Sequence, residues 1–115
     1  MNSNFVSEKF IMKIALASPS YPKSIDDGIK QLQAMVEDAA KQSATIICFP
    51  ETYIPGYPLD LNNAKKTSPE LLKDALQKTC AIAKANSIAI IMPMDWYEED
   101  AFLNVAFVAK CANIG

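Results

Sequence analysis

The sequence predicts an α/β fold in which strands and helices follow the order β-α-β-α-β-β. Short apolar runs without a polar face, at residues 45–49 and 88–92, are typical of strands buried in a parallel sheet. Amphipathic segments with recognisable helix starts separate the first three strands. Because strands that alternate with helices pair through right-handed crossovers, we expect the first three strands to be parallel.

The first half of the chain contributes a strand, a helix and a second strand. Residues 12–18 form the first predicted strand, and a proline-containing loop follows it. Ser24 is a candidate N-cap for a helix that ends near Lys41, with Asp27 in its first turn. The apolar positions at helical spacing are Ile25, Ile29, Leu32, Met35, Val36 and Ala39. Residues 45–49 form the second strand.

The second half begins with a loop, residues 50–67, that is long for a strand-to-helix connection and therefore indicates function. Ser68 is the expected cap of a helix that begins at Pro69 and ends near Asn86. Its predicted buried face is Leu71, Leu72, Ala75, Leu76, Thr79, Ile82 and Ala83.

Two further strands complete the predicted order. A third strand, 88–92, is expected to stop at Pro93, and residues 96–101 form an acid-rich turn. Residues 103–109 form the fourth strand. The acidic side chains around Trp96 and Tyr97 suit a hard cation, but their spacing lacks the framework of a calcium loop, so a solvated turn is the preferred interpretation. These side chains are Asp95, Glu98, Glu99 and Asp100.

Composition indicates a globular domain rather than a disordered chain. The 115 residues are 50% hydrophobic and 21% charged, with a net charge of -2. Lysines are spread opposite acidic residues, so no nucleic-acid partner is predicted. No apolar run is long enough to span a bilayer, and residues 1–11 read as a loose leader without a secretory signal. We therefore expect no membrane partner and a cytoplasmic protein, with one domain over residues 12–115.

The chain contains no histidine, which excludes Ser-His-Asp and Cys-His catalysis and most zinc and haem sites. Three scattered cysteines do not suggest a disulfide framework. Only three glycines occur, and none follows the first strand, which argues against a phosphate-binding turn. No cofactor and no metal are predicted.

Glu51 is the strongest candidate for chemistry. It follows Pro50 directly at the exit of the buried strand 45–49, and ligands bind beyond the carboxyl ends of strands in open α/β sheets. The loop that follows carries Tyr53 and Tyr57, which could line a substrate pocket and keep solvent from the carboxylate. Tyrosines that only pack within a proline-rich loop would give the same sequence pattern, so this alternative stays open.

The run Phe49-Pro50-Glu51, followed by Thr52-Tyr53-Ile54-Pro55-Gly56-Tyr57-Pro58, resembles the first catalytic segment of the nitrilase, or carbon–nitrogen hydrolase, superfamily. The first strand, the helix that follows it and the strand that opens at Asn104 resemble the same family. The resemblance implies a portion of a four-layer αββα sandwich. It also implies a homo-oligomer at full length and a small nitrile or amide as the substrate.

The resemblance also implies a Glu–Lys–Cys triad, in which Glu51 matches the general base. A cysteine thiolate attacks the nitrile or amide carbon, and a lysine stabilises the developing charge. In the family both residues lie beyond the strand that resembles Asn104–Val108. Lys110 and Cys111 come too early to replace them, so we interpret Lys110 as a solvated strand-end residue and Cys111 as a small hydrophobe.

Two function classes therefore stay open. In the first, the chain is the incomplete N-terminal part of a hydrolase, is inactive alone and exposes apolar sheet surface. In the second, it is a truncated non-catalytic α/β module that pairs with another chain or binds a small ligand. Neither remaining cysteine changes this choice, since Cys48 lies within a strand and Cys80 is expected near the core face of a helix.

Overall fold

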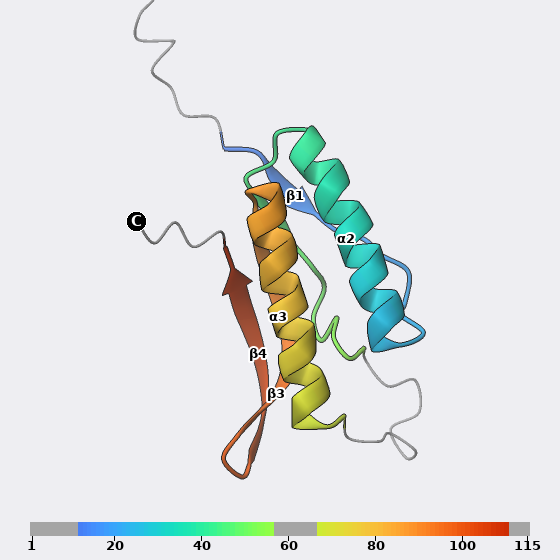
Figure 1. Cartoon of the computed structure of the whole chain (residues 1–115), viewed down its shortest axis with the longest axis vertical. Helices are drawn as coiled ribbons and strands as arrows, with labels where there is room; N and C mark the ends of the chain where they lie inside the picture. The colour runs from blue at the N-terminus through green and yellow to red at the C-terminus, as the bar shows by residue number, and fades with distance from the viewer. Residues whose placement is uncertain (1–11, 57–66, 111–115) are drawn as a thin grey trace, which may run out of the picture.

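The computed structural model describes residues 12–56 and 67–110, which form a four-stranded sheet with two helices on one face (Figure 1). The strands are β1 (Ile14–Leu16), β2 (Ile46–Cys48), β3 (Ala89–Glu98) and β4 (Ala101–Ala109). They lie in this order across the sheet. The first three pair in parallel and β4 pairs antiparallel with β3, so the predicted element order and the parallel pairing are confirmed. The predicted leader, residues 1–11, lies outside the described residues.

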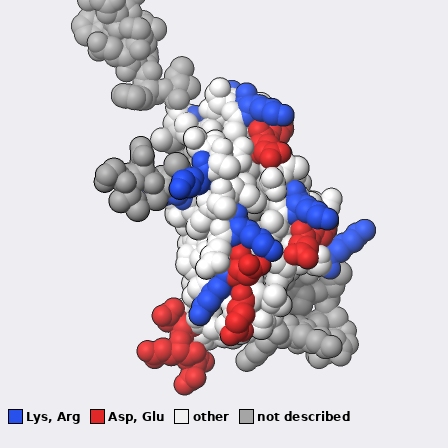
Figure 2. Space-filling view, viewed as in Figure 1, with Lys and Arg blue, Asp and Glu red and all other residues white. Residues whose placement is uncertain are grey.

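The helices α2 (Ile25–Lys41) and α3 (Pro69–Asn86) begin and end as the sequence predicts. Each cap serine accepts a hydrogen bond at Oγ from a backbone N–H three residues later, at 3.0 Å for Ser24 and 3.3 Å for Ser68. Lysine and acidic side chains are interspersed over the helices (Figure 2). This distribution agrees with the solvated faces expected from the sequence.

The prediction that Pro93 ends the third strand is wrong, because β3 continues to Glu98. The carbonyl of Pro93 points to the β2 side of the strand, where it accepts from Ile54 N at 3.5 Å. β2 has already ended at this level, since its last paired residue, Cys48, lies beside Ile91. The N–H that proline lacks would point to that same side, so its absence leaves the ladder with β4 intact.

Trp96 and Tyr97, expected in a turn, are therefore strand residues, and the turn itself comprises Glu99 and Asp100. Figure 2 shows acidic side chains gathered at the tip of this β3–β4 hairpin. The fourth strand also begins earlier than predicted, at Ala101. The long hairpin arises because the register pairs nine residues on each side, from Ile90 with Ala109 to Glu98 with Ala101.

The core lies between the sheet and the helices. Sheet residues at alternate positions point into it, and the most buried of them are Ile47, Ile90, Met92 and Met94. Helix α2 contributes Ile29, Leu32, Val36 and Ala39, as expected. On α3, Leu71 is 54% exposed, which corrects its predicted place on the buried face. Leu71 lies at the flank of the stripe formed by Leu72, Ala75, Thr79 and Ala83.

The opposite face of the sheet, which we call the open face, carries no helix among the described residues. Apolar side chains point outward there: Leu16 is 81% exposed, Val108 61% and Ile14 53%. The expectation of exposed apolar sheet surface is thus met in the described residues. Glu51, the sequence-predicted candidate for chemistry, lies at the rim of this face.

Candidate functional site

The chain turns where β2 ends, and Glu51 lies in that turn. Tyr53 N donates to the Pro50 carbonyl at 3.2 Å, which closes the turn. Thr52 is buried and has a φ of 48°, in the left-handed region that β-branched residues rarely adopt. Backbone strain of this kind persists only where surrounding contacts impose it, and it is frequent at functional sites.

Helix α2 and strand β3 supply those contacts. Ile54 forms a short parallel bridge with β3, in which Asp95 N donates to the Ile54 carbonyl at 3.1 Å. Tyr53 Oη donates to the carbonyl of Gly28 on α2 at 2.7 Å. Gly28 permits this close approach, because a Cβ there would lie 3.0 Å from Ile54 Cδ1. The turn that carries Glu51 is therefore fastened to two elements of the core.

A third contact reaches Glu51 itself. Asn104 on β4 donates from Nδ2 to Glu51 Oε1 at 3.1 Å. Asn104 is paired with Asp95 across the β3–β4 ladder, and both side chains point to the open face. Partial burial raises the pKa of the Asp95 carboxyl. The rim of the open face thus holds Glu51 and Asp95 together with the Asn104 amide, which is bonded to Glu51.

A pocket of about 260 Å³ opens beside Glu51. Its lining comes from the loops that follow β1 and β2: Pro19, Ser20, Tyr21, Pro22, Pro50, Glu51, Thr52, Tyr53 and Gly56. Gly56 has a φ of 109°, and a Cβ there would lie 3.5 Å from Tyr21 Oη. Neighbouring parallel strands end at the same edge of a sheet, which is where ligands bind in such folds.

Tyr53 does not screen Glu51 from solvent as the sequence led us to expect. The Glu51 side chain is exposed, whereas the Tyr53 ring turns inward and is only 3% exposed. Burial, together with the nearby charge of Asp27, raises the pKa of Tyr53 to about 12. Its hydroxyl donates to the Gly28 carbonyl, and Tyr53 is also one of the residues that line the pocket. Tyr57 lies outside the described residues.

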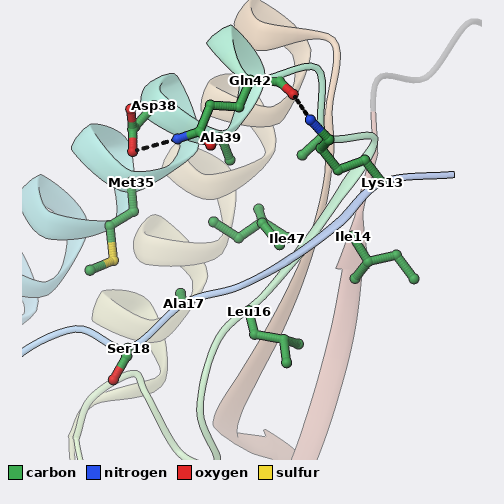
Figure 3. Close-up of a pocket in the computed structure, with 12 residues that line it drawn as sticks. Lys13, Ile14, Leu16, Ala17, Ser18, Met35, Asp38, Ala39, Gln42 and Ile47 are labelled. Atoms are coloured by element: carbon green, nitrogen blue, oxygen red, sulfur yellow. Dashed lines mark hydrogen bonds between the residues drawn. The ribbon is translucent and has the colours of Figure 1, made fainter.

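A second pocket, of about 340 Å³, lies between β1 and α2 and shares no lining residue with the first (Figure 3). Lys13 Nζ donates to the Gln42 carbonyl at 2.8 Å, and Gln42 Nε2 donates to Asp38 Oδ2 at 3.2 Å. Ile14 and Leu16 point away from α2, toward the open face (Figure 3). This pocket contains no candidate for chemistry.

Neither of the two described cysteines lines the pocket beside Glu51. Cys48 lies within β2 and is half-buried, while Cys80 is exposed on α3, which corrects its expected place near the core. Cys80 follows the buried Thr79 by one residue, a rotation of about 100° around the helix, so it leaves the buried stripe. Lys110 is exposed just past β4, in agreement with its interpretation as a solvated strand-end residue. Cys111 lies outside the described residues.

Two kinds of feature are missing from the part of the chain that the structure describes. No three His, Cys, Asp or Glu side chains gather there in a way that could hold a metal ion. Across residues 12–56 and 67–110, neither helix is long and apolar enough to cross a membrane.

Sequence reasoning assigned no role to Asn104 or Tyr21. The signal for Tyr21 was its place among prolines after the first strand, at the expected ligand edge. For Asn104 no local signal sufficed, because its contact with Glu51 spans 53 residues and depends on the register of β4.

Comparison with solved structures gives the same architecture. An amidase from Nesterenkonia sp. is 24% identical with a TM-score of 0.66, covering 76% of this chain and 33% of the amidase. The glutamine-dependent NAD+ synthetase from Acinetobacter baumannii is 25% identical with a TM-score of 0.74, covering 87% of this chain and 19% of the synthetase. The present chain thus spans a third or less of these proteins. Its fold is that of the nitrilase-type structures.

Sequence comparison places the chain in a family. A search of curated proteins finds no match. The family model described as carbon-nitrogen hydrolase matches residues 13–110, which include both loops of the Glu51 pocket and the whole sheet. The chain therefore belongs to the carbon–nitrogen hydrolase family.

Proposed function

We propose that the protein containing this chain hydrolyses a carbon–nitrogen bond of a small nitrile or amide, with Glu51 as general base. The observation that carries the proposal is the fastening of Glu51 at the carboxyl end of β2, beside a pocket and within reach of solvent. A base needs a fixed position and access to the proton it removes. Family membership makes a hydrolase the first choice among the chemistries open to a carboxylate.

The proposed reaction uses a cysteine from outside the described residues. Glu51 removes the thiol proton, and the thiolate attacks the amide carbonyl carbon. A lysine stabilises the oxyanion. Ammonia then leaves with the proton from Glu51. Water, deprotonated by Glu51, attacks the thioester and releases the acid, and Glu51 returns that proton to the leaving thiolate. Support for a cysteine nucleophile comes from a mutant of the Nesterenkonia amidase, whose active-site cysteine carries the covalently added acetamide moiety of fluoroacetamide.

The described residues hold only the base, and we propose that the 115-residue chain does not turn over substrate alone. Cys48 and Cys80 come from a sheet strand and an exposed helix surface, so neither shares the Glu51 pocket.

The test is ammonia release by the native protein that carries this sequence, assayed over a panel of uncharged aliphatic and aromatic nitriles and amides. Glu51→Gln should lower kcat/KM at least about 100-fold, because the base is lost while the shape is kept. Glu98→Gln, an exposed glutamate at the hairpin tip, is the matched control and should leave kcat/KM unchanged. Normal turnover in Glu51→Gln would rule out this base.

The open face favours a second candidate, a non-catalytic module that pairs with another chain through its apolar side chains. The same panel separates the two. The pairing role is supported if the native protein releases no ammonia and co-purifies with one protein partner, and if Val108→Lys abolishes this co-purification.

A further inference from the structure

The rim of the open face contains an amide that no step of the proposed reaction uses. Asn104 lies on β4, an edge strand among the described residues, and its side chain points away from the helices. Most of its neighbours on this face are apolar, including Phe102, Ala106 and Val108. Asn104 is itself exposed, and its side chain donates a hydrogen bond to Glu51.

The ladder geometry explains how Asn104 reaches Glu51. On β3, Pro93 O and Asp95 N bond to Ile54, on the β2 side. Asp95 and Asn104 therefore face each other as a non-hydrogen-bonded pair, in which cross-strand side chains approach most closely. The Asn104 side chain extends from β4 across β3 toward the turn that follows β2, where Nδ2 donates to Glu51 Oε1 at 3.1 Å.

We propose that Asn104 is a positioning residue, which holds one oxygen of Glu51 so that the other faces the pocket. This inference rests on the proposed function of Glu51 as base. The donor occupies Oε1 and leaves Oε2 without a hydrogen bond from any described residue. A glutamate on an exposed turn samples several rotamers, and one charge-assisted hydrogen bond is enough to select among them.

The side-chain type is specific to this task. An amide donates to a carboxylate without bringing a further negative charge, whereas an aspartate at position 104 would place one beside Glu51 and opposite Asp95 and repel both. Leucine has nearly the same shape but no donor. Glutamine keeps the donor on a longer stem.

The kinetic experiment uses the native protein that carries this sequence. Asn104→Leu should lower kcat by about 10- to 100-fold, the equivalent of one hydrogen bond to a charged group, with KM changed less than about threefold. Asn104→Gln should recover part of the lost kcat. Asn86→Leu is the matched control, because Asn86 Nδ2 donates to the Ile82 carbonyl in α3, far from Glu51 in the fold. Its kcat should stay that of the wild type.

A second measurement does not depend on activity. In the whole 115-residue chain, Glu51→Ala should move the NMR resonances of the Asn104 side-chain amide, whereas those of Asn86 stay in place. This readout also holds if a variant at position 104 folds poorly, because it observes the wild-type amide.

The outcomes separate the two proposals. An unchanged kcat in Asn104→Leu, or a change in KM alone, overturns the positioning role while leaving the base assignment in place. The positioning role is also overturned if the Asn104 side-chain resonances do not shift in Glu51→Ala. If instead the native protein hydrolyses nothing on the panel, the proposed function fails, and the NMR result still decides whether Asn104 holds Glu51.

Discussion

The two faces of the sheet are built from similar residues but have opposite surroundings. On the helix-covered face, Ile90, Met92 and Met94 are fully buried against α2 and α3. On the open face, Ile14 and Leu16 are more than half exposed, although they are equally apolar. Apolar sequence alone thus does not separate the two faces, because in a parallel sheet both faces are apolar.

Glu51 lies where these two environments meet. Its turn is fastened from the helix side by Tyr53, and its carboxylate is held from the open face by Asn104. A rigid, buried support on one side and an accessible carboxylate on the other are what a base at a strand end requires. The turn that carries Glu51 thus takes its support from the covered face and its access to solvent from the open face.

Adjacent residues on β3 give the sharpest test of this contrast. Ile90→Ala should lower the free energy of unfolding by about 2–5 kcal/mol, because it opens a cavity in the closed core. Ile91→Ala, one residue later on the open face, should cost less than half as much, since Ile91 keeps contact with water. Urea titration of both variants measures the difference. Equal losses would mean that the open face is covered in solution.

The support from the helix side is tested by Tyr53→Phe. Loss of the 2.7 Å hydrogen bond to Gly28 should lower the free energy of unfolding by about 1–2 kcal/mol at pH 7. The pKa of Tyr53 is about 12 in the folded state and 10.0 in the unfolded chain, so the tyrosine of the unfolded wild type loses its proton at lower pH. Wild-type stability therefore falls as pH rises from 10 to 12.

The phenylalanine variant lacks this ionisation. The difference in free energy of unfolding between the wild type and the variant should therefore narrow over the same pH range. Urea midpoints at several alkaline pH values measure it. A constant gap would contradict the assigned burial of the hydroxyl.

Charge on the open face should affect association more than folding. Val108→Lys changes an exposed position, so the free energy of unfolding should move by less than about 0.5 kcal/mol. Self-association of the 115-residue chain, followed by sedimentation velocity, should weaken severalfold because the charge interrupts the apolar surface. Gln33→Lys, on the exposed side of α2, is the control and should leave association unchanged. A wild-type chain that stays monomeric at every concentration would refute this expectation.

The smallest effect is expected at Asp95. Burial raises its folded-state pKa above the value of 3.8 for the free side chain, so the folded state binds the proton more tightly. Stability from this group is complete at pH values below the unfolded pKa and is lost as pH rises through the folded one. Asp95→Asn should therefore stabilise the fold at pH 7 by a few tenths of a kcal/mol, about the screened value for a group partly in water. The gain should vanish near pH 3 in acid titrations of thermal unfolding.

Local patterns were enough for much of the fold. Both helices begin and end where the caps at Ser24 and Ser68 and the apolar spacing predict. The parallel order of the first three strands follows from their alternation with helices. The prediction about Pro93 was wrong for a reason that no local pattern contains, because the tolerance of that proline depends on where its neighbour β2 ends.

Short-range patterns were sufficient for the element order, the helix boundaries and the position of Glu51 at a strand end, because each depends on residues close together in the chain. The side chains that bond to Glu51, and the face of the sheet that stays open, follow instead from long-range packing. Asn104 lies 53 residues from Glu51 and Tyr53 lies 25 from Gly28. Such contacts depend on strand register and helix packing, which emerge only when the whole core has assembled.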